Sequence, residues 1–188
     1  MSDAITDAQN LGPLAFLSGA WEGDKGDDKA PDDNRGVETN KYRERTVFEP
    51  TGLVQNHEQY LYGLRYRTIA WRIGEPDSFH EEVGYWMWDA AARQVIRCFI
   101  VPRGVTVIAG GTVAPDAKTF SLAAEVGSDT YGICSNRFLD AEFKTVKYDL
   151  KITVLNKDSY SYEGTTHLKI KGQEKIFPHI DKNTMTRV

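Results

Sequence analysis

The sequence predicts an all-β protein: a single antiparallel up-and-down β-barrel of about ten strands, preceded by a short N-terminal helical turn. Three observations support this fold class. From about residue 39 onward, apolar and polar residues alternate in runs of strand length. Short turns rich in Gly, Pro, Asn and Asp separate the runs, and no helical pattern is long enough for a βαβ unit. Barrel closure is favoured over the competing β-sandwich because it removes exposed sheet edges.

The N-terminal part of the chain changes character twice before this alternation begins. Residues 11–17 are apolar but too few for an independent helix, so we expect one or two helical turns that plug the barrel. Residues 19–23 open the first strand. Residues 24–36 hold five aspartates, a proline and glycines, with almost nothing to bury. That composition predicts an acidic, mobile loop.

Runs of strand length then follow one another, each ended by a turn. We expect strands at residues 41–48, 53–66, 68–73, 79–88, 94–101, 105–113 and 118–125, and an irregular stretch at 127–141. The clearest strand is residues 143–155, where Val146, Tyr148, Leu150, Ile152 and Val154 share one face. After a tight turn at residues 156–158, residues 159–170 return with Tyr160, Tyr162, Leu168 and Ile170 on the inner face.

Length and net charge limit the classes of function that the protein can have. The 188 residues fit one domain, residues 1–188, which can bury a substantial core without disulfides. The net charge of −4 argues against nucleic acid or an anionic membrane as the main partner. No apolar run approaches the ~20 residues that span a bilayer, and residues 1–10 lack the basic start of a secretory signal. We therefore expect a cytoplasmic protein, with Cys98 and Cys134 reduced rather than disulfide-bonded.

Motifs for hydrolytic or phosphate-binding chemistry are absent from the sequence, and no catalytic residue is assigned. The chain has no Gly-x-Ser-x-Gly and no P-loop. Glu81 and Glu82 are adjacent in a strand, so they point to opposite faces and cannot form an acid/base pair by themselves. The four histidines show none of the close spacings of a zinc site: His57, His80, His167 and His179. Of these, His167 is expected to face solvent.

The segment Ile176–Asp181 decides between two interpretations of the barrel, because it places His179 just after a proline near the end of the chain. Imidazole is the side chain most able to bind a metal near neutral pH. Either His179 points into the barrel cavity and holds an iron, or it is an ordinary histidine in a closing strand or turn. From the residues alone, both interpretations stay open.

Several short motifs, in order along nearly the whole chain, resemble those of the nitrobindins. Residues 17–23, Leu-Ser-Gly-Ala-Trp-Glu-Gly, with Gly26 beyond, resemble their Gly-x-Trp-x-Gly-x-Gly opening. Residues 41–48 resemble their second strand, and Phe-His-Glu-Glu-Val-Gly-Tyr at 79–85 resembles a later one. Phe-Pro-His-Ile at 177–180 lies where the family has its axial histidine. Nitrobindins are haem-binding β-barrels, similar in shape to fatty-acid-binding proteins and to lipocalin-like barrels.

This resemblance implies a cofactor and a set of site residues. The barrel would hold haem b, with His179 as the proximal ligand of a ferric iron. Thr46 and His80 would line the haem neighbourhood, and Trp21 would close the barrel floor. The implied activity is nitric oxide binding and isomerisation of peroxynitrite to nitrate, in which a dry pocket leaves the sixth iron position for a small ligand.

The sequence also departs from the nitrobindin pattern. The glycine motif is one residue longer here, and Asp181 and Asn183 share strand parity with His179, which would place polar groups beside an iron ligand. The alternative is therefore a haem-free carrier, similar to lipocalins or fatty-acid-binding proteins, that binds a small apolar ligand among the aromatic residues Trp71, Tyr85, Trp86, Trp88, Tyr148, Tyr160 and Tyr162. In either case the expected partner is a small molecule in the cavity. A homodimer is among the oligomeric states that we expect.

Overall fold

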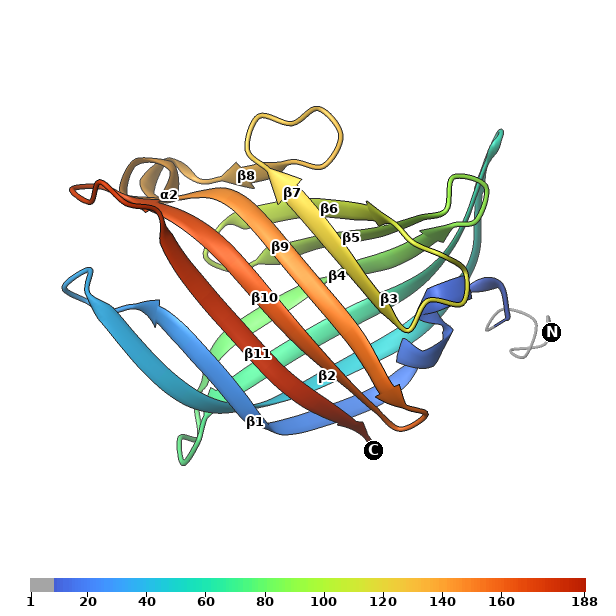
Figure 1. Cartoon of the computed structure of the whole chain (residues 1–188), viewed down its shortest axis with the longest axis horizontal. Helices are drawn as coiled ribbons and strands as arrows, with labels where there is room; N and C mark the ends of the chain where they lie inside the picture. Colours follow the sequence, from blue (N-terminus) through green and yellow to red (C-terminus); the bar gives the residue numbers. More distant parts are fainter. Residues whose placement is uncertain (1–8) are drawn as a thin grey trace.

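In the computed structural model, which describes residues 9–188, one eleven-stranded sheet makes up almost the whole chain. The strands follow the order β5-β4-β3-β2-β1-β11-β10-β9-β7-β6-β8, and β5 also pairs with β6, so ten strands close into an antiparallel barrel and β8 lies outside the ring (Figure 1). The fold class predicted from the sequence is confirmed. The elements are η1 (Gly12–Leu17), β1 (Gly19–Pro31), β2 (Val37–Asn56), β3 (Gln59–Arg72), β4 (Ser78–Asp89), β5 (Gln94–Val101), β6 (Val105–Thr112), β7 (Thr119–Glu125), β8 (Ile133–Ser135), α2 (Arg137–Glu142), β9 (Phe143–Asn156), β10 (Ser159–Ile170) and β11 (Phe177–Arg187).

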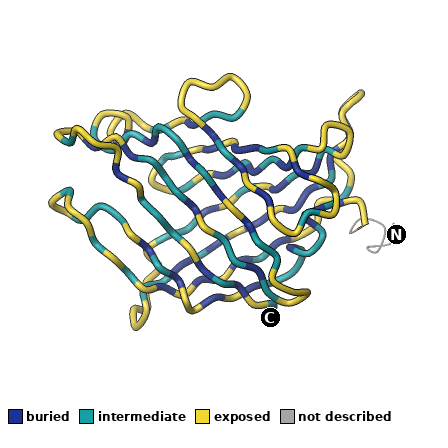
Figure 2. The backbone as a smooth tube through the Cα atoms, viewed as in Figure 1, coloured by how far each residue is buried: buried dark blue, intermediate teal, exposed yellow. Residues whose placement is uncertain are grey.

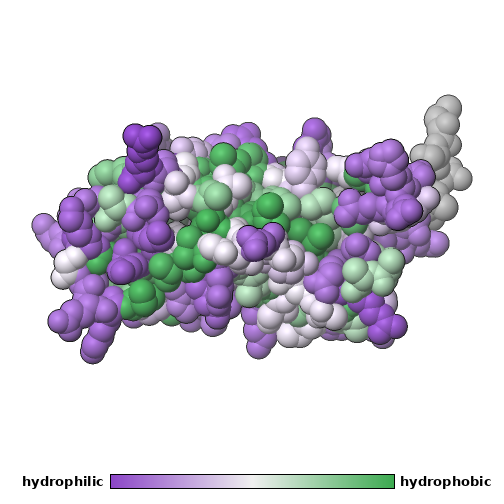
Figure 3. Space-filling model, turned by 90° about the horizontal axis from the view of Figure 1, so that it is seen from above, coloured by the Kyte–Doolittle hydropathy of each residue, from purple (hydrophilic) through white to green (hydrophobic). Residues whose placement is uncertain are grey.

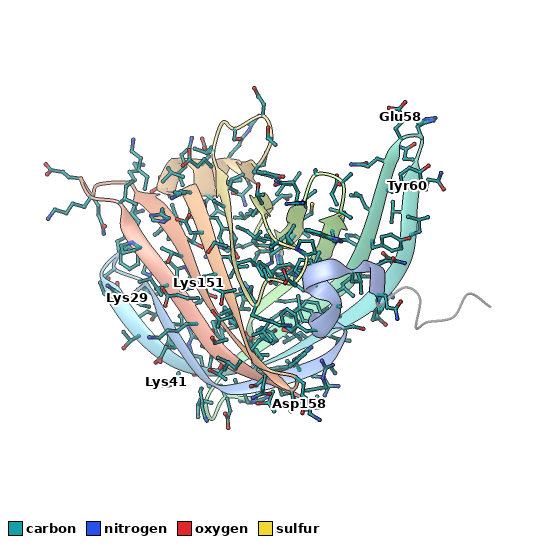
Figure 4. The ribbon with its side chains drawn as sticks, turned by 45° about the vertical axis from the view of Figure 1, so that its right-hand side comes forward. Lys29, Lys41, Glu58, Tyr60, Lys151 and Asp158 are labelled. Carbon is teal, nitrogen blue, oxygen red and sulfur yellow. The ribbon has the colours of Figure 1, made fainter. Side chains whose placement is uncertain are left out.

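The two ends of the barrel differ. At one end, here called the plug end, lie η1, the β9–β10 turn and the C-terminus; at the other, the loop end, lie α2 and the turns at residues 32–36, 73–77 and 171–176 (Figure 1). Along the strands, buried residues alternate with exposed or half-buried ones (Figure 2), as expected for a wall with one face inward. The β2–β3 hairpin, with Glu58 and Tyr60 near its tip, projects beyond the ring (Figure 4). No helix in the described part is long and apolar enough to span a membrane.

An apolar core fills the plug end. Trp21 is fully buried, its indole Nε1–H donates to the Leu17 carbonyl at 2.7 Å, and its ring meets Tyr160 edge-on at 4.9 Å between centroids. Leu14 and Leu17 of η1 are 0 and 1 % exposed, which is the plugging position expected for residues 11–17. Proline at the start and a following Gly19 in the left-handed region limit η1 to six residues.

The expectation of a loop over residues 24–36 is wrong for residues 24–31. Strand β1 runs on to Pro31, and only residues 32–36 form the turn to β2. The aspartates stay in the strand because the pairing partners of Asp27 and Asp28 include Lys41, Asn40 and Lys182, which supply cations or amide donors. Polar composition therefore marked a strand whose side chains are paired across the sheet.

The extra residue in the glycine motif is a β-bulge. The register of β1 with β2 shifts between Gly23 and Gly26, so four residues of β1 span the space that three occupy opposite. At both glycines a Cβ would collide with neighbours: with the Tyr42 ring at 2.6 Å for Gly26 and with Met185 at 2.7 Å for Gly23. The glycines are thus required because inward side chains from β2 and β11 pack directly on the β1 backbone.

The stretch at residues 127–141 is more ordered than predicted. It contains β8 and the short helix α2, whose N-cap residue Asn136 accepts a hydrogen bond from the Leu139 N–H at 2.9 Å. Strand β8 extends β6 at the loop end, whereas β6 and β7 share a single pair, Gly110 with Ala123. The loop before β8 therefore covers part of the junction between β6 and β7, where the Tyr131 ring lies over Gly110.

Two of the aromatic residues expected inside the barrel lie outside it. Tyr85 is 47 % exposed on the outer face of β4, and Trp71 packs beneath the Arg43 guanidinium at 4.4 Å on the outer wall. Trp71 faces outward by the ordinary alternation of β3, because Thr68 and Ala70 are the buried, inward residues and β2 pairs with this part of β3 without a shift. The other five aromatic residues face inward as expected: Trp86, Trp88, Tyr148, Tyr160 and Tyr162.

Candidate functional site

His179 lies on the inward face of β11 at the loop end, one strand away from Asp28. Its Nε2 atom is 2.8 Å from Asp28 Oδ1, and Asp28 is 7 % exposed while the imidazole is 33 % exposed. The other carboxylate oxygen of Asp28 accepts a hydrogen bond from the Asn40 amide at 3.2 Å. Strand β11 is regular here, so the residues of the same parity, Asp181 and Asn183, also face inward. The polar inner face expected from the sequence is confirmed.

Next to this pair is a hydrogen-bonded cluster of two tyrosines and one carboxyl group. The Tyr162 hydroxyl donates to Glu44 Oε2 at 2.7 Å, and the hydroxyls of Tyr162 and Tyr42 are 2.7 Å apart. Burial of Glu44, which is 6 % exposed, raises its pKa to about 8. Glu44 therefore holds a proton at neutral pH, and the cluster can both donate and accept hydrogen bonds.

A buried ion pair between β4 and β5 crosses the interior beyond this cluster. Glu82 and Arg97 are each 8 % exposed and form a direct salt bridge. The Arg97 guanidinium also bonds the hydroxyls of Tyr66 and Tyr148, and its central carbon lies 4.3 Å from the Phe99 ring centroid. Burial opposes ionisation of Glu82, but the charge of Arg97 together with His80 and the Tyr66 hydroxyl outweighs it, and the pKa of Glu82 is lowered to about 2.

His80 connects these groups electrostatically. Its Nε2 lies 3.8 Å from Glu82 Oε2, and although burial alone would lower its pKa, the carboxylates of Glu82 and Asp181 raise it. Burial raises the pKa of Asp181, which interacts with both His179 and His80. The loop end thus gathers two imidazoles, four carboxyl groups and one guanidinium in one polar interior, which we call the loop-end cluster: Asp28, Tyr42, Glu44, His80, Glu82, Arg97, Tyr162, His179 and Asp181.

Comparisons with known proteins place this barrel in a family. Residues 10–187 match the model of the THAP4-like, heme-binding beta-barrel domain. The chain belongs to the THAP4-like haem-binding β-barrel family. This confirms the haem-binding, nitrobindin-like barrel expected from the sequence, and haem is the ligand that the family's description implies. The chain also superposes on the crystal structure of Rv2717c from M. tuberculosis with a TM-score of 0.67 and 22 % identity over 99 % of each chain, which shows a shared fold. The search of curated proteins found no match.

Whether the residues of this THAP4-like barrel fit haem can be tested at His179. Its imidazole faces inward and is partly accessible at the loop end, and Asp28 occupies its Nε2 atom. Haem iron needs only one nitrogen of this kind from the protein, because the porphyrin supplies the equatorial ligands. Within the described residues, no group of three or more His, Cys, Asp or Glu side chains could hold a bare metal ion. The donor at His179 fits haem, on the condition that Nε2 leaves Asp28 to bind iron.

The structure groups the predicted site residues into two pairs. His179 and His80 both belong to the loop-end cluster. Thr46 and Trp21 lie deeper and pair with each other across β1 and β2. Thr46 is buried and its hydroxyl is 2.7 Å from that of Thr68, while Trp21 forms the floor of the plug end, as the resemblance implied.

The remaining histidines lie away from the cluster. His167 is on the outer wall, where its Nε2 is 2.8 Å from Asp149 Oδ2, close to the solvent-facing position predicted. His57 occupies the β2–β3 turn with φ at +54° and is exposed. Glu81 and Glu82 do face opposite sides: Glu81 pairs with Arg67 at the surface, while Glu82 is buried.

Sequence reasoning missed most of the loop-end cluster. Asp28 was not identified because residues 24–36 were expected to form a loop. Tyr42 and Glu44 share parity with Phe48 in an alternating strand, and that inward position was the available signal for a buried carboxyl group. Arg97 carried no signal, because a single arginine in an apolar run becomes informative only when its partner on another strand is known.

Proposed function

We propose that this barrel binds haem b through His179 and that the bound ferric haem handles nitric oxide and peroxynitrite, isomerising the latter to nitrate. The observation that carries the proposal is an inward imidazole on β11, partly open to solvent at the loop end, in a chain of the haem-binding family. A bound haem supplies an iron whose sixth coordination position can take a small ligand.

The chain's own residues would have separate parts in holding such a group. His179 would supply the axial nitrogen once its Nε2 has left Asp28, whose carboxylate keeps its hydrogen bond from Asn40. The ion pair of Glu82 with Arg97, together with the apolar plug around Trp21, closes the interior to water from the plug end. Protonated Glu44 and the Tyr162 hydroxyl offer hydrogen bonds to a small polar ligand in the cluster.

The test is a titration of the purified apoprotein with hemin, followed by absorption spectroscopy. We expect a saturable Soret band that His179→Ala abolishes or shifts, because the axial nitrogen is lost. His167→Ala is the matched control, since this histidine also pairs with an aspartate but on the outer wall. Absence of a Soret band at saturating hemin, or equal spectra for both variants, would refute ligation by His179.

Nitric oxide and peroxynitrite handling needs its own measurement. Stopped-flow decay of peroxynitrite should be faster with the haem-loaded protein than with free hemin at equal concentration, with nitrate as the product. Equal rates would show that the barrel contributes nothing beyond holding the haem.

A haem-free carrier of a small ligand is the second candidate. The engagement of His179 Nε2 by a buried carboxylate favours it, since that nitrogen is already satisfied. Native mass spectrometry of protein purified without added hemin distinguishes the two: a co-purified apolar molecule supports the carrier, and a mass increment of haem supports the first proposal.

We also propose that the chain forms a homodimer through the outer face of β4, β5 and β6. Exposed apolar side chains adjoin there, with Val83 paired with Ile100 and Tyr85 next to Cys98 and Ile108. Figure 3 shows a hydrophobic band among hydrophilic surroundings on the face seen from above. Contiguous apolar patches of this kind mark interaction sites. Sedimentation velocity should show a dimer that Ile100→Lys dissociates, while Leu155→Lys, similarly exposed on β9, leaves it intact.

Residence in the cytoplasm is part of the proposal. Its support is that Cys98 and Cys134 are both free thiols, on β5 and β8. Fractionation of the cells that express the protein would test it, and recovery outside the cytoplasm would overturn it.

A further inference from the structure

A hollow of about 360 Å³ lies on the outer wall of the barrel, and Tyr162 of the loop-end cluster is part of its lining. It lies where β1 and β11 separate, between the pair Glu22–Thr186 and the pair Asp27–Lys182. Its lining comes from four adjacent strands: Lys25, Asp27, Lys151, Thr153, Ser161, Tyr162, Glu163, Lys182, Asn183 and Thr184. In volume it is at the lower end of the roughly 300–1,000 Å³ typical of small-molecule sites.

The β-bulge in β1 produces this hollow. Residues 23–26 of β1 face residues 183–185 of β11 without regular pairing, although the β1 backbone at Gly23 packs closely on Asn183 and Thr184. Tyr162 and Asn183 have inward parity and also line the hollow, so they contribute to its floor. The Asn183 Oδ1 atom accepts a hydrogen bond from the Thr184 N–H at 2.8 Å.

Three lysines and two carboxylates line the hollow, so positive charge is in excess there. Among the described residues, Lys25, Lys151 and Lys182 form no ion pair within 4 Å, while Asp27 is paired with Lys41. Asn183 is 4 % exposed, and its Nδ2 has no hydrogen-bond partner among the described residues. Buried donors of this kind are normally satisfied, and this one packs against the backbone of Gly23 at the floor of the hollow. Figure 4 shows Lys151 on the outer wall formed by β9 and its neighbours.

The acidic residues in the lining define the rest of the ligand. Glu163 lies between Lys151 and Lys182 in register, so its carboxylate offers acceptors beside the ammonium groups. The hydroxyls of Thr153, Ser161 and Thr184 can both donate and accept. A ligand that matches this lining carries an anionic group for the lysines and hydroxyl groups for Glu163.

We propose that this hollow is a binding site for a small phosphorylated polyol, with its phosphate among Lys25, Lys151 and Lys182 and its hydroxyls toward Glu163. The site shares Tyr162 with the loop-end cluster, but its lysines lie outside that cluster and it does not depend on haem. The three lysines gather positive charge on a chain whose net charge is −4, so the site would attract anions that the rest of the surface repels.

Isothermal titration calorimetry with the full-length protein tests this, using ribose 5-phosphate, ribose and inorganic phosphate as probes. We expect ribose 5-phosphate to bind most tightly, inorganic phosphate more weakly, and ribose not at all. Lys182→Met should weaken ribose 5-phosphate at least about tenfold, since it removes one ammonium from the phosphate. Lys169→Met is the matched control: it is an exposed lysine of the neighbouring strand β10, also without an ion pair within the described residues, and it lies outside the hollow.

The two variants distinguish a built site from general attraction to surface charge. Equal loss in Lys182→Met and Lys169→Met would mean such general attraction and would overturn the site. No heat from any probe at millimolar concentration, or ribose binding as well as ribose 5-phosphate, would overturn it too. Inorganic phosphate as the tightest ligand would overturn the polyol part, because Glu163 would then have no role. Thermal melting of each variant confirms that the barrel is intact, and Lys151→Met gives a second, independent variant.

Discussion

The plug end and the loop end of the barrel are built by the same strands but with opposite kinds of inward side chain. Toward the plug end the inward positions carry Trp21, Leu64 and Met185, all 0 % exposed. Toward the loop end the same strands β1 and β11 carry Asp28 and His179. Stability is therefore concentrated where the interior is apolar, and titratable chemistry where it is polar. The contrast teaches that in this barrel function and stability occupy separate lengths of the same strands.

The largest effect on stability is expected at Trp21, which forms the floor of the plug end. Trp21→Ala should lower the free energy of unfolding by roughly 3–5 kcal/mol, because a fully buried indole and its hydrogen bond to Leu17 are lost. Urea denaturation measures this. Trp71→Ala is the control, since that ring lies on the outer wall beneath Arg43. Similar losses in the two variants would contradict the view that the plug end dominates stability.

Loss of the Glu82–Arg97 ion pair, which lies between the plug end and the polar loop end, should lower the free energy of unfolding nearly as much. Arg97→Met leaves the buried Glu82 carboxylate without its arginine, with Tyr66 and His80 as its remaining partners, and loss of such a buried ion-pair partner typically costs about 3 kcal/mol or more near neutral pH. Because the folded-state pKa of Glu82 is lowered to about 2, its contribution is present above the ordinary carboxyl pKa and is lost as pH falls toward 2. The arginine variant should lack that acid-side loss. Adding Glu82→Gln should recover most of the stability; no recovery would argue against the ion pair.

Glu44 gives a pH dependence of opposite sign. Its folded-state pKa is raised from 4.5 to about 8, so between these values the unfolded chain releases a proton that the folded chain keeps. Stability should therefore fall as pH rises through this window, by up to about 1.4 kcal/mol per pH unit. In Glu44→Gln this slope should vanish. If the free energies of unfolding of the two proteins change with pH in parallel from about pH 5 to about pH 8, Glu44 is ionised in the folded state.

The smallest effect is expected midway, at the threonine pair. Thr46→Val leaves the buried Thr68 hydroxyl without its 2.7 Å partner and should cost about 1–2 kcal/mol. Thr46→Val combined with Thr68→Val should be close to neutral, because no unsatisfied hydroxyl remains. A double-mutant cycle measures the coupling, and additive losses would place the two hydroxyls out of contact.

The fold was predictable to a large extent, and the site much less so. Alternation in β9 and β10 identified Tyr148, Leu150, Ile152 and Tyr160 as inward, because a one-residue slip would have exposed all of them. The acidic stretch at residues 24–36 was misjudged because composition shows which groups are polar but not which partners satisfy them. Asp28 is the example: Asn40 and His179, distant in the sequence, complete its environment.

The roles of the site residues implied by the resemblance stay predictions, and the structure shows only where these residues lie. His179 does face inward at the loop end. What could not be predicted is that Glu82 and Arg97 meet across β4 and β5, or that Tyr162 bonds Glu44 from a strand 118 positions away. Each is a pairing set by strand order around the barrel, and a single sequence does not fix that order.

The single pair between β6 and β7 has a consequence for how the barrel opens. Ladder contacts run continuously from β7 around the ring to β6, so the wall behaves as a coiled ribbon whose two edges are joined by an insert. That insert is the segment before and including β8, through Gly132, whose carbonyl accepts from the Ile108 N–H at 2.9 Å. Hydrogen exchange should therefore release the amides of Val107 and Ile108 in a sub-global opening that leaves β2 and β3 protected. The segment before and including β8, which looks irregular in the sequence, would then hold the two edges of the barrel wall together.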